Sequence, residues 1–534
     1  MPHFYAAETS EKVFRNATKP ADTCSGRDPD TGRSATMTSQ SARAIANRLR
    51  VLFVASEIYP LAKTGGLADV CGALPLALAK AGDIDMLLML PGYDSAIAAV
   101  PDAREIATLP DLPGGPARLL IGTMPDSDIE VVLLDQPGSF RRQGGLYIDE
   151  DGREWADNAI RFAALAHAAV DLAMGRVRPH WRADIVHCND WHTGLIPVLL
   201  AVQPGHRPRT ILTLHNLAFQ GLFPPCILPE LALPRGSFSV DGIEYFGQIS
   251  FLKGGINFAD KLTTVSPSYA GEIVTPEFGM GLEGLLASRK ADLVGIMNGI
   301  DETVWNPAED AAIAHPYSIG ELACKQRCKR ALQQDWGLIC DPAAPLFVFA
   351  ARLESQKMAD TLLDLLPDLM ERPHLQIAIL GKGAIPLQDG FTAWPARAPG
   401  RVAVRIGYQE DWAHRLLAGG DMLIHGARFE PCGLTPIYAM RYGTIPIVRA
   451  VGGLRDSVTA VSAAPIADST ASGFQFDEAN AVSMLDAIDT ALEFYARPDV
   501  WRQLQRNGMI RDFSWHGPAA RYRQIYEELA LEAV

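Results

Sequence analysis

The sequence predicts an α/β protein with two doubly wound, Rossmann-like domains that face a central cleft. Short apolar runs fit for buried parallel strands alternate with helical segments, and they do so in two separate series. Polar residues or glycine pairs follow most of these runs. In open α/β sheets, ligands bind beyond the carboxyl ends of the strands. A length of 534 residues is enough for two to four domains.

Composition narrows the class of protein. Hydrophobic residues make up 48% of the chain and charged residues 21%, close to a globular average. The net charge of −14 disfavours non-specific binding to nucleic acid or to an anionic membrane. No run of 18 apolar residues indicates a membrane span. The eight cysteines are scattered without a CxxC pair, which favours a reducing, cytoplasmic compartment.

Domain boundaries follow from shifts in this pattern. Five divisions are expected. They are a disordered N-terminal extension over 1–49 with a possible start at Met37, an N-terminal Rossmann-like domain over 50–305, a partly helical connection over 306–344, a C-terminal Rossmann-like domain over 345–510, and a C-terminal helical segment over 511–534. The last helix, expected at Pro518–Leu531, is amphipathic and could pack on either domain, including a return to the N-terminal one.

The expected elements come in chain order. The first series comprises strands at Val51–Ala55, Met86–Leu90, Ile185–Val186, Thr210–Leu214 and Leu262–Val265, with a helix at Leu67–Lys80. The second comprises strands at Leu346–Ala350, Gln376–Leu380, Val402–Ile406, Asp421–Ile424 and Ile445–Val448. Asp83-Ile84-Asp85 imitates a DxD metal motif, but we interpret it as a turn before a strand. Cys324 and Cys328 are four apart in an expected helix, where two ordinary thiols are favoured over half of a metal site.

Two glycine pairs lie between a strand and a helix. Gly65-Gly66 follows Lys63, and glycine lets the backbone approach a ligand while a helix N-terminus favours phosphate. On spacing alone, a plain tight turn is about as well supported. Gly452-Gly453 repeats the geometry in the second series. One such loop per half suggests that both halves approach one anionic ligand.

Charged residues follow two strands of the second series. Arg352 and Lys357 can neutralise a diphosphate and stabilise a departing nucleotide, although solvated surface charges are the better interpretation by pattern alone. Glu430 could bind sugar or ribose hydroxyls, and Thr435 with nearby amides could meet phosphate. A helix cap is the alternative for this segment.

Acid–base groups follow two strands of the first series. Asp190-Trp191-His192 and His215-Asn216 could bind sugar hydroxyls or move protons, or could be hydrogen-bonded structure. HxH and HExxH spacings are missing, so no metal site is predicted.

Taken together, these segments resemble bacterial glycogen synthases and plant starch synthases, the retaining α-glucan synthases with GT-B architecture. The matching segments are Ser56-Glu57, Lys63–Val70, Asp190-Trp191-His192, His215–Gly221, Gly247–Lys253, Asn298–Asp301, Arg352-Leu353 with Gln356-Lys357, Arg428–Thr435 and Asp512–Trp515. They cover about residues 50–530 in unbroken order, which makes the set far more specific than any single motif.

The resemblance implies an ADP-glucose-dependent hexosyltransferase that lengthens an α-1,4-glucan at its non-reducing 4-hydroxyl with retention of configuration. Glycogen or a malto-oligosaccharide would be the acceptor. No cofactor, metal, nucleic acid or membrane is implied, and the oligomeric state is left open. The same resemblance also implies roles for individual residues.

On the phosphate side, Lys63 with Gly65 and Gly66 would contact donor phosphate, and Arg352 and Lys357 would bind the diphosphate. Around the sugar, Glu430 would orient the donor glucose, and Asp190 and His215 would line the sugar subsite. Near the nucleotide, Tyr408 would stack on adenine and Asn298 would lie close by, while the donor site would be completed by Cys432, Gly433, Leu434 and Thr435.

The sequence departs from the family pattern at four places. The usual Gly after Lys357 is Met358, the usual Pro-Ser before Arg428 is Gly426-Ala427, a usual Asp is Ala384, and a usual Thr is Val451. Met358 and Val451 matter most, because they adjoin the expected phosphate groups. If a glycine is needed at 358 for a positive φ, a β-carbon there would shift the backbone.

Two other functions compete with this interpretation. A related GT-B enzyme could make a small glucoside or use UDP-glucose, but such relatives often carry a second Glu where this chain has Tyr438. A weakened glucan- or nucleotide-binding protein would explain the four departures. Retention of Lys63, Arg352, Lys357 and Glu430 together makes it the lesser alternative.

Overall fold

The computed structural model describes residues 48–80, 82–234, 236–407, 409–462 and 470–532. These belong to one compact unit, Arg48–Val534. Met37 and nearly all of the expected extension lie outside the described residues, as does Tyr408.

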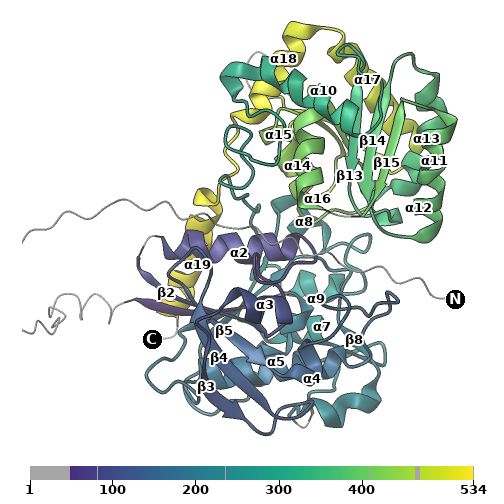
Figure 1. The fold of residues 1–534 in the computed structure, drawn as a ribbon. Helices are drawn as coiled ribbons and strands as arrows, with labels where there is room; N and C mark the ends of the chain where they lie inside the picture. Colours follow the sequence, from purple (N-terminus) through teal and green to yellow (C-terminus); the bar gives the residue numbers. More distant parts are fainter. Residues whose placement is uncertain (1–47, 81, 235, 408, 463–469, 533–534) are drawn as a thin grey trace, which may run out of the picture. The chain divides into compact units, whose positions relative to one another are not determined.

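The first sheet has nine strands in the order β12-β11-β7-β6-β1-β2-β5-β4-β3 (Figure 1). Its strands are β1 (Leu49–Val54), β2 (Ile84–Pro91), β3 (Arg104–Leu109), β4 (Ala117–Thr123), β5 (Glu130–Asp135), β6 (Ile185–Asn189), β7 (Arg209–Leu214), β11 (Lys261–Thr264) and β12 (Leu293–Gly295). Pairing is parallel from β12 to β5 and antiparallel among β5, β4 and β3.

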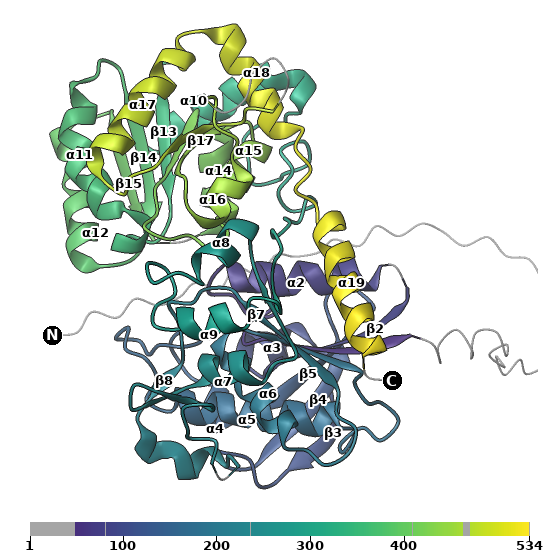
Figure 2. The same ribbon diagram turned by 180° about the vertical axis from the view of Figure 1, so that it is seen from behind.

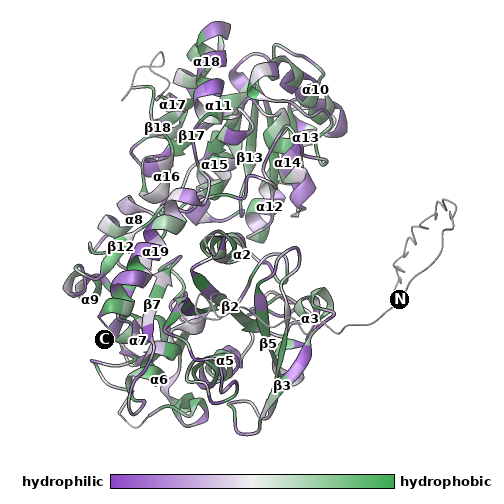
Figure 3. Cartoon of the chain, turned by 90° about the vertical axis from the view of Figure 1, so that its left-hand side faces the viewer, coloured by the Kyte–Doolittle hydropathy of each residue, from purple (hydrophilic) through white to green (hydrophobic). Residues whose placement is uncertain are grey.

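Helices flank this sheet because its central strands are apolar on both faces. Val51 to Val54 of β1 are fully buried, and β2 and β5 are coloured hydrophobic in Figure 3. The helices are α2 (Gly66–Ala79), α3 (Asp94–Ala99), α4 (Pro137–Phe140), α5 (Asn158–Ala173), η1 (Trp191–Thr193), α6 (Leu195–Ala201), η2 (Pro225–Leu231), α7 (Phe251–Phe258), α8 (Pro267–Glu272) and α9 (Glu283–Ser288). A small antiparallel sheet, β8-β10-β9, comprises β8 (Leu222–Phe223), β9 (Glu244–Tyr245) and β10 (Gln248–Ser250).

The second sheet has six parallel strands in the order β15-β14-β13-β16-β17-β18. They are β13 (Leu346–Ala350), β14 (Gln376–Gly381), β15 (Val402–Ile406), β16 (Met422–His425), β17 (Ile445–Arg449) and β18 (Phe474–Phe476). The helices of this part are η3 (Ile319–Cys324), α10 (Lys325–Asp335), η4 (Ser355–Lys357), α11 (Ala359–Glu371), α12 (Ile385–Thr392), α13 (Trp394–Arg397), α14 (Glu410–Gly419), α15 (Leu434–Arg441), α16 (Gly452–Ser457), α17 (Ala481–Tyr495) and α18 (Pro498–Met509).

The last helix, α19 (His516–Leu531), packs on the core of the first sheet and lies beside α2 (Figure 2). Two buried tyrosine side chains of α19 pack into this core. Tyr522 and Tyr526 are fully buried, and the Tyr526 hydroxyl lies 2.7 Å from Nδ1 of His187 in β6. The chain therefore returns to its first sheet after completing its second.

Several details differ from the sequence-based expectation. β2 begins at Ile84, so Asp85 lies within the strand rather than in a turn, and its carboxylate accepts a hydrogen bond from the Trp181 indole (3.0 Å). Cys324 lies in η3 and only Cys328 in α10.

Within the described residues, no group of three or more His, Cys, Asp or Glu side chains could hold a metal ion. In the same residues, no helix has the length and apolar character needed to cross a membrane.

Candidate active site

A buried ion pair joins the ends of β13 and β16. Lys357 closes η4 after β13, and its Nζ contacts Oε2 of Glu430, which follows β16. Nε2 of His425, the last residue of β16, lies 3.2 Å from the same oxygen. Burial alone would raise the pKa of Glu430, but the Lys357 charge and the His425 contact outweigh it and lower that pKa to about 2. Glu430 is therefore a carboxylate at neutral pH.

Arg428 fixes the turn that carries Lys357. Its backbone amide donates to the Gln356 carbonyl (2.8 Å). Its guanidinium donates to both carboxylate oxygens of Asp360 (2.9 Å each) and to the Ser355 carbonyl. Such two-pronged Arg–carboxylate pairing is strongly directional, so Arg428 orients residues 355–360 as a unit.

Arg352 lies near this pair but does not join it. Its guanidinium, 46% exposed, binds Glu354 (2.9 Å) and the Gln356 side-chain oxygen (3.0 Å). The Gln356 amide in turn donates to the Phe429 carbonyl (3.3 Å). Arg352 is thus the accessible cation of this edge, while Lys357 is the buried one.

Met358 takes the left-handed backbone conformation, with φ of 51°. The positive φ that a glycine would favour at this position is thus present, and methionine adopts it while fully buried. A β-carbon at Gly426 would lie 3.2 Å from both Cβ and Sδ of Met358. Two of the departures from the family pattern are therefore neighbours in space. Val451, by contrast, has an ordinary extended backbone with φ of −135°.

The segment after Glu430 forms the N-terminus of α15. Gly433 has φ of 80° and begins this helix, with Leu434 and Thr435 in its first turn. Cys432 is buried against Asn298, and burial raises the pKa of its thiol to about 12, so the thiol stays neutral.

The first Gly-Gly loop is held by carboxylates. Glu57 accepts hydrogen bonds from the amides of Thr64 and Gly65. Lys63 Nζ lies 2.8 Å from Asp69 and 2.7 Å from Glu410 at the start of α14.

Gly66 faces the second half of the chain. A β-carbon there would lie 3.3 Å from Cδ1 of Leu434. Together with the Lys63–Glu410 contact, this proximity brings the first Gly-Gly loop to the edge that carries Glu430.

The second Gly-Gly loop, Gly452-Gly453, is bound by residues of α8. The Gly452 amide donates to Glu272 of α8 (2.8 Å). In return, Asp456 of α16 accepts from the amide (2.8 Å) and hydroxyl (2.6 Å) of Ser268 in α8. The amide that the sequence suggested for a phosphate thus binds an internal carboxylate in this structure.

Asp190 and His215 meet at the ends of β6 and β7. Asp190 has a positive φ of 56°, and its Oδ1 accepts from the His215 amide (2.7 Å). Burial raises the pKa of Asp190 to about 7. Burial likewise lowers the pKa of His215 to about 3, and its Nε2 lies 3.0 Å from Oδ1 of Asn189. This edge therefore holds nearly neutral groups.

Sequence reasoning assigned no role to several buried groups of the site. Glu57 accepts from the Tyr147 hydroxyl (2.9 Å), and Tyr147 stacks on His192 at 4.6 Å. Tyr269 of α8 is buried, and its hydroxyl accepts a hydrogen bond from the Leu217 amide (3.1 Å), just beyond β7. Glu57 lies three residues beyond the end of β1, and this position near a strand end was the available signal. No comparable signal marked Tyr147 or Tyr269.

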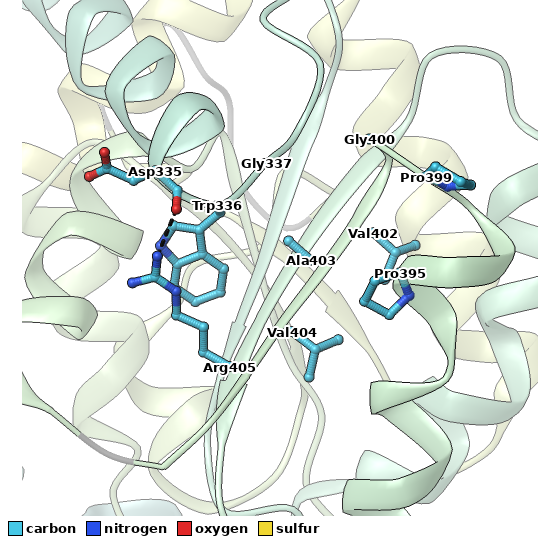
Figure 4. A pocket seen from close by; sticks show the side chains of 10 residues that line it. All are labelled: Asp335, Trp336, Gly337, Pro395, Pro399, Gly400, Val402, Ala403, Val404 and Arg405. Atoms are coloured by element: carbon cyan, nitrogen blue, oxygen red, sulfur yellow. Dashed lines mark hydrogen bonds between the residues drawn. The ribbon is translucent and has the colours of Figure 1, made fainter.

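A cavity of about 290 Å³ lies elsewhere, at the β15 edge of the second sheet (Figure 4). The guanidinium of Arg405 lies 4.6 Å from the Trp336 ring there and donates to the Asp335 carbonyl (2.7 Å). None of the candidate residues lines this cavity, so it is separate from the strand-end site.

Comparisons with known proteins agree with this geometry. The model of the starch synthase catalytic domain matches residues 50–288, and that of glycosyl transferases group 1 matches residues 338–507. A glycogen synthase from Burkholderia thailandensis is 50% identical over 481 residues, which are 90% of each chain. One from Paramagnetospirillum magneticum is 46% identical over 485 residues, 90% of this chain and 98% of the relative.

Solved structures extend the likeness. The catalytic domain of starch synthase IV from Arabidopsis thaliana, bound to ADP and acarbose, superposes with a TM-score of 0.82 at 30% identity, over 90% of this chain and 99% of that one. A sucrose-phosphate synthase from Thermosynechococcus elongatus shares the fold. It superposes with a TM-score of 0.54 at 18% identity, over 90% of this chain and 99% of that one.

Two Rossmann-like halves with cations and a carboxylate at their strand ends define a glycosyltransferase of GT-B architecture, which confirms the predicted fold class. Within that class the chain belongs to the glycogen and starch synthase family, and its activity is that of a glycogen synthase.

Proposed function

We propose that the protein transfers glucose from ADP-glucose to the non-reducing 4-hydroxyl of an α-1,4-glucan with retention of configuration. The Lys357–Glu430 pair, with accessible Arg352 on the same segment, is the observation that carries this proposal. A starch synthase structure of similar fold is bound to ADP and acarbose, which supports a nucleotide donor and a glucan acceptor.

The transfer breaks the bond between the anomeric carbon and the diphosphate oxygen, and it joins the acceptor oxygen to that carbon. The electron pair of the broken bond stays on ADP, and the acceptor proton passes to a phosphate oxygen. Lys357 and Arg352 stabilise the negative charge that develops on the leaving diphosphate. Glu430 orients the donor glucose, and Asp190 with His215 binds sugar hydroxyls.

The remaining donor contacts are proposed on the same basis. In this proposal Lys63 and the Gly65-Gly66 loop meet donor phosphate, and the Lys63–Glu410 contact with the approach of Gly66 to Leu434 supports it. Asn298 and Cys432 to Thr435 form the adjoining wall. A cofactor-independent reaction and a cytoplasmic location remain predictions from the sequence. Undiminished activity in excess EDTA is expected.

The decisive experiment incubates the protein with ADP-glucose or UDP-glucose, with and without a malto-oligosaccharide. Nucleotide release and chain length are measured together. Primer-dependent ADP release with chains longer by single glucose units is expected. Faster release from UDP-glucose would overturn the donor assignment. Ligand-induced thermal stabilisation without any release would favour a binding protein instead.

A further inference from the structure

His425 is a buried polar residue at the end of an otherwise apolar strand. The three residues before it in β16, Met422–Ile424, are fully buried, and His425 itself is 2% exposed. Burying an imidazole is unfavourable unless its nitrogens find hydrogen-bond partners. Nε2 lies 3.2 Å from Oε2 of Glu430, whereas Nδ1 is buried without a hydrogen-bond partner among the described residues. An apolar side chain would suit this position better, so packing alone does not explain the histidine.

The contact with Glu430 identifies the protonated nitrogen of His425. A carboxylate can only accept hydrogen bonds, so Nε2 must carry the proton that lies between the two side chains. With the proton on Nδ1, the lone pair of Nε2 would face a negative oxygen, and an N–H group would be buried without an acceptor. Burial lowers the pKa of His425 against the opposing effect of the Glu430 contact, so the ring is a neutral donor at neutral pH.

His425 and Lys357 bind the same oxygen of Glu430. The Lys357 ammonium contacts Oε2 as a charged donor, and the imidazole directs a second hydrogen bond at that oxygen. Because His425 is neutral, the second bond adds direction without adding a second positive charge to the pair. The two donors come from different elements, η4 and β16, so the carboxylate is fixed from two sides.

The backbone of Glu430 is held independently of its side chain. Its carbonyl accepts a hydrogen bond from the Gly453 amide (3.0 Å). Nη1 of Arg449 donates to the Arg428 carbonyl (2.7 Å), which fixes the turn between His425 and Glu430. With the backbone and Oε2 both fixed, the direction of the remaining carboxylate oxygen, Oε1, is set as well.

From these contacts we propose that His425 is a positioning residue, whose Nε2–H group holds Oε2 of Glu430 so that Oε1 is presented to a hydroxyl of the donor glucose. The proposal rests on the proposed function, in which Glu430 orients that sugar. Displacing an orienting group by about 1 Å can reduce the rate by about 10²-fold. His425 acts through Glu430 rather than on the substrate itself.

Two substitutions separate this role from packing. His425→Gln places an amide N–H near the position of Nε2, whereas His425→Leu fills the site without a donor. Initial rates with ADP-glucose and a malto-oligosaccharide are measured beside thermal unfolding. We expect His425→Leu to lower kcat about 10- to 100-fold with the acceptor KM unchanged, and His425→Gln to stay within about 3-fold of wild type. Equal losses in both variants, or normal kcat in folded His425→Leu, would overturn the proposal.

The dependence on Glu430 is measured in the Glu430→Gln background. If His425 acts through that carboxylate, His425→Leu should lower kcat there by less than about 2-fold. An undiminished loss in that background would contradict the positioning role.

His187→Leu is the matched control. His187 is a buried strand histidine of β6, outside the site, whose ring nitrogens lie 2.6 Å from the Thr213 hydroxyl and 2.7 Å from the Tyr526 hydroxyl. The control should lower the unfolding temperature and leave kcat unchanged. A loss of kcat equal to that of His425→Leu would reveal a general packing effect and refute the assignment.

A spectroscopic measurement tests the contact without relying on glucose transfer. Proton–nitrogen correlation spectra of protein labelled with nitrogen-15 histidine distinguish the two neutral tautomers, and the His425 signal is the one that His425→Gln lacks. We expect a neutral ring protonated on Nε2 at pH 7, with a changed Nε2 shift in Glu430→Gln. A ring protonated on Nδ1, or a shift that Glu430→Gln leaves unchanged, would overturn the proposal even if His425→Leu fails to fold. If wild type releases nucleotide from neither ADP-glucose nor UDP-glucose, the proposed function fails, while an Nε2-protonated ring that responds to Glu430→Gln still supports the hold of His425 on Glu430.

Discussion

The two strand edges of the site carry buried acids of opposite character. At the first edge, Asp190 has a pKa raised to about 7 by burial, and its carboxylate accepts hydrogen bonds from the backbone amides of His215 and Asn216. At the second, Glu430 is equally buried, yet the Lys357 charge lowers its pKa to about 2. Burial alone therefore does not decide the charge of an acid at a strand end. The presence of a cation beside the carboxylate does.

Removal of Lys357, the cation that keeps Glu430 ionised, should have the largest effect on the difference between the two edges. Lys357→Ala is expected to lower kcat by about 10²- to 10⁴-fold, because the leaving diphosphate loses its buried counter-charge. The same change leaves Glu430 buried without its partner, so its pKa should rise and the protein should lose stability. Initial rates and thermal unfolding are measured together at neutral pH.

The control is Lys290→Ala, which removes an exposed lysine of the first half. It should match wild type in both measurements. Near-normal turnover in folded Lys357→Ala would refute the role of Lys357 on the leaving-group side.

Neutralising the acid tests the other member of the pair. Glu430→Gln keeps the shape of the side chain but leaves Lys357 uncompensated. We expect a fall in kcat of about 10- to 10³-fold, with the protein still folded, because the donor glucose is no longer fixed by a carboxylate. Steady-state kinetics against ADP-glucose provides the measurement. Glu478→Gln, at an exposed position, is the control, and full activity in Glu430→Gln would rule out the orienting role.

The first edge is tested by pH. The pKa of Asp190 is higher in the folded protein than its ordinary value of 3.8, so the folded state holds the proton more tightly. Its contribution to stability is complete below about pH 4 and is lost as pH rises through about 7, by at most about 4 kcal/mol. Asp190→Asn does not titrate. Its stability relative to wild type should therefore increase from pH 4 to pH 7 and then level off.

Thermal unfolding of the two proteins across that range provides the comparison. Asp128→Asn, at an exposed loop position, should show no such pH-dependent difference. A constant offset between Asp190→Asn and wild type would mean that Asp190 is ionised throughout, like Glu430.

Strand ends were the part of the site that sequence could predict. Apolar runs ended close before Asp190, His215 and Glu430, and in the structure these residues follow β6, β7 and β16. Partners distant in sequence could not be predicted. Glu410 lies 347 residues from Lys63, and Glu272 lies 180 residues from Gly452, so only the folded chain shows that carboxylates hold both Gly-Gly loops.

For the fold, as for the site, the sequence predicted only part of the structure. The strands expected from apolar runs lie close to their expected residues, but the parallel strands β5, β12 and β18 were not among them. The antiparallel pair β3 and β4 was missed because both strands carry exposed, polar positions at the sheet margin. The segment β8 to β10 was missed because its strands are only two or three residues long.

The smallest expected effect is on stability and concerns the packing of Met358, the residue after Lys357, against Gly426. Met358 directly follows Lys357 in a left-handed conformation, and a β-carbon at Gly426 would lie 3.2 Å from its Cβ and Sδ and 2.7 Å from Cε of Met484. Gly426→Ala should therefore destabilise the wild type by about 1–3 kcal/mol through overpacking. Met358→Gly removes the strained β-carbon but leaves a cavity, so it should also destabilise. In the Met358→Gly background, Gly426→Ala should cost less, with a coupling of about 1–2 kcal/mol measured by denaturant unfolding of the four proteins. Strictly additive effects would mean that the two positions are independent.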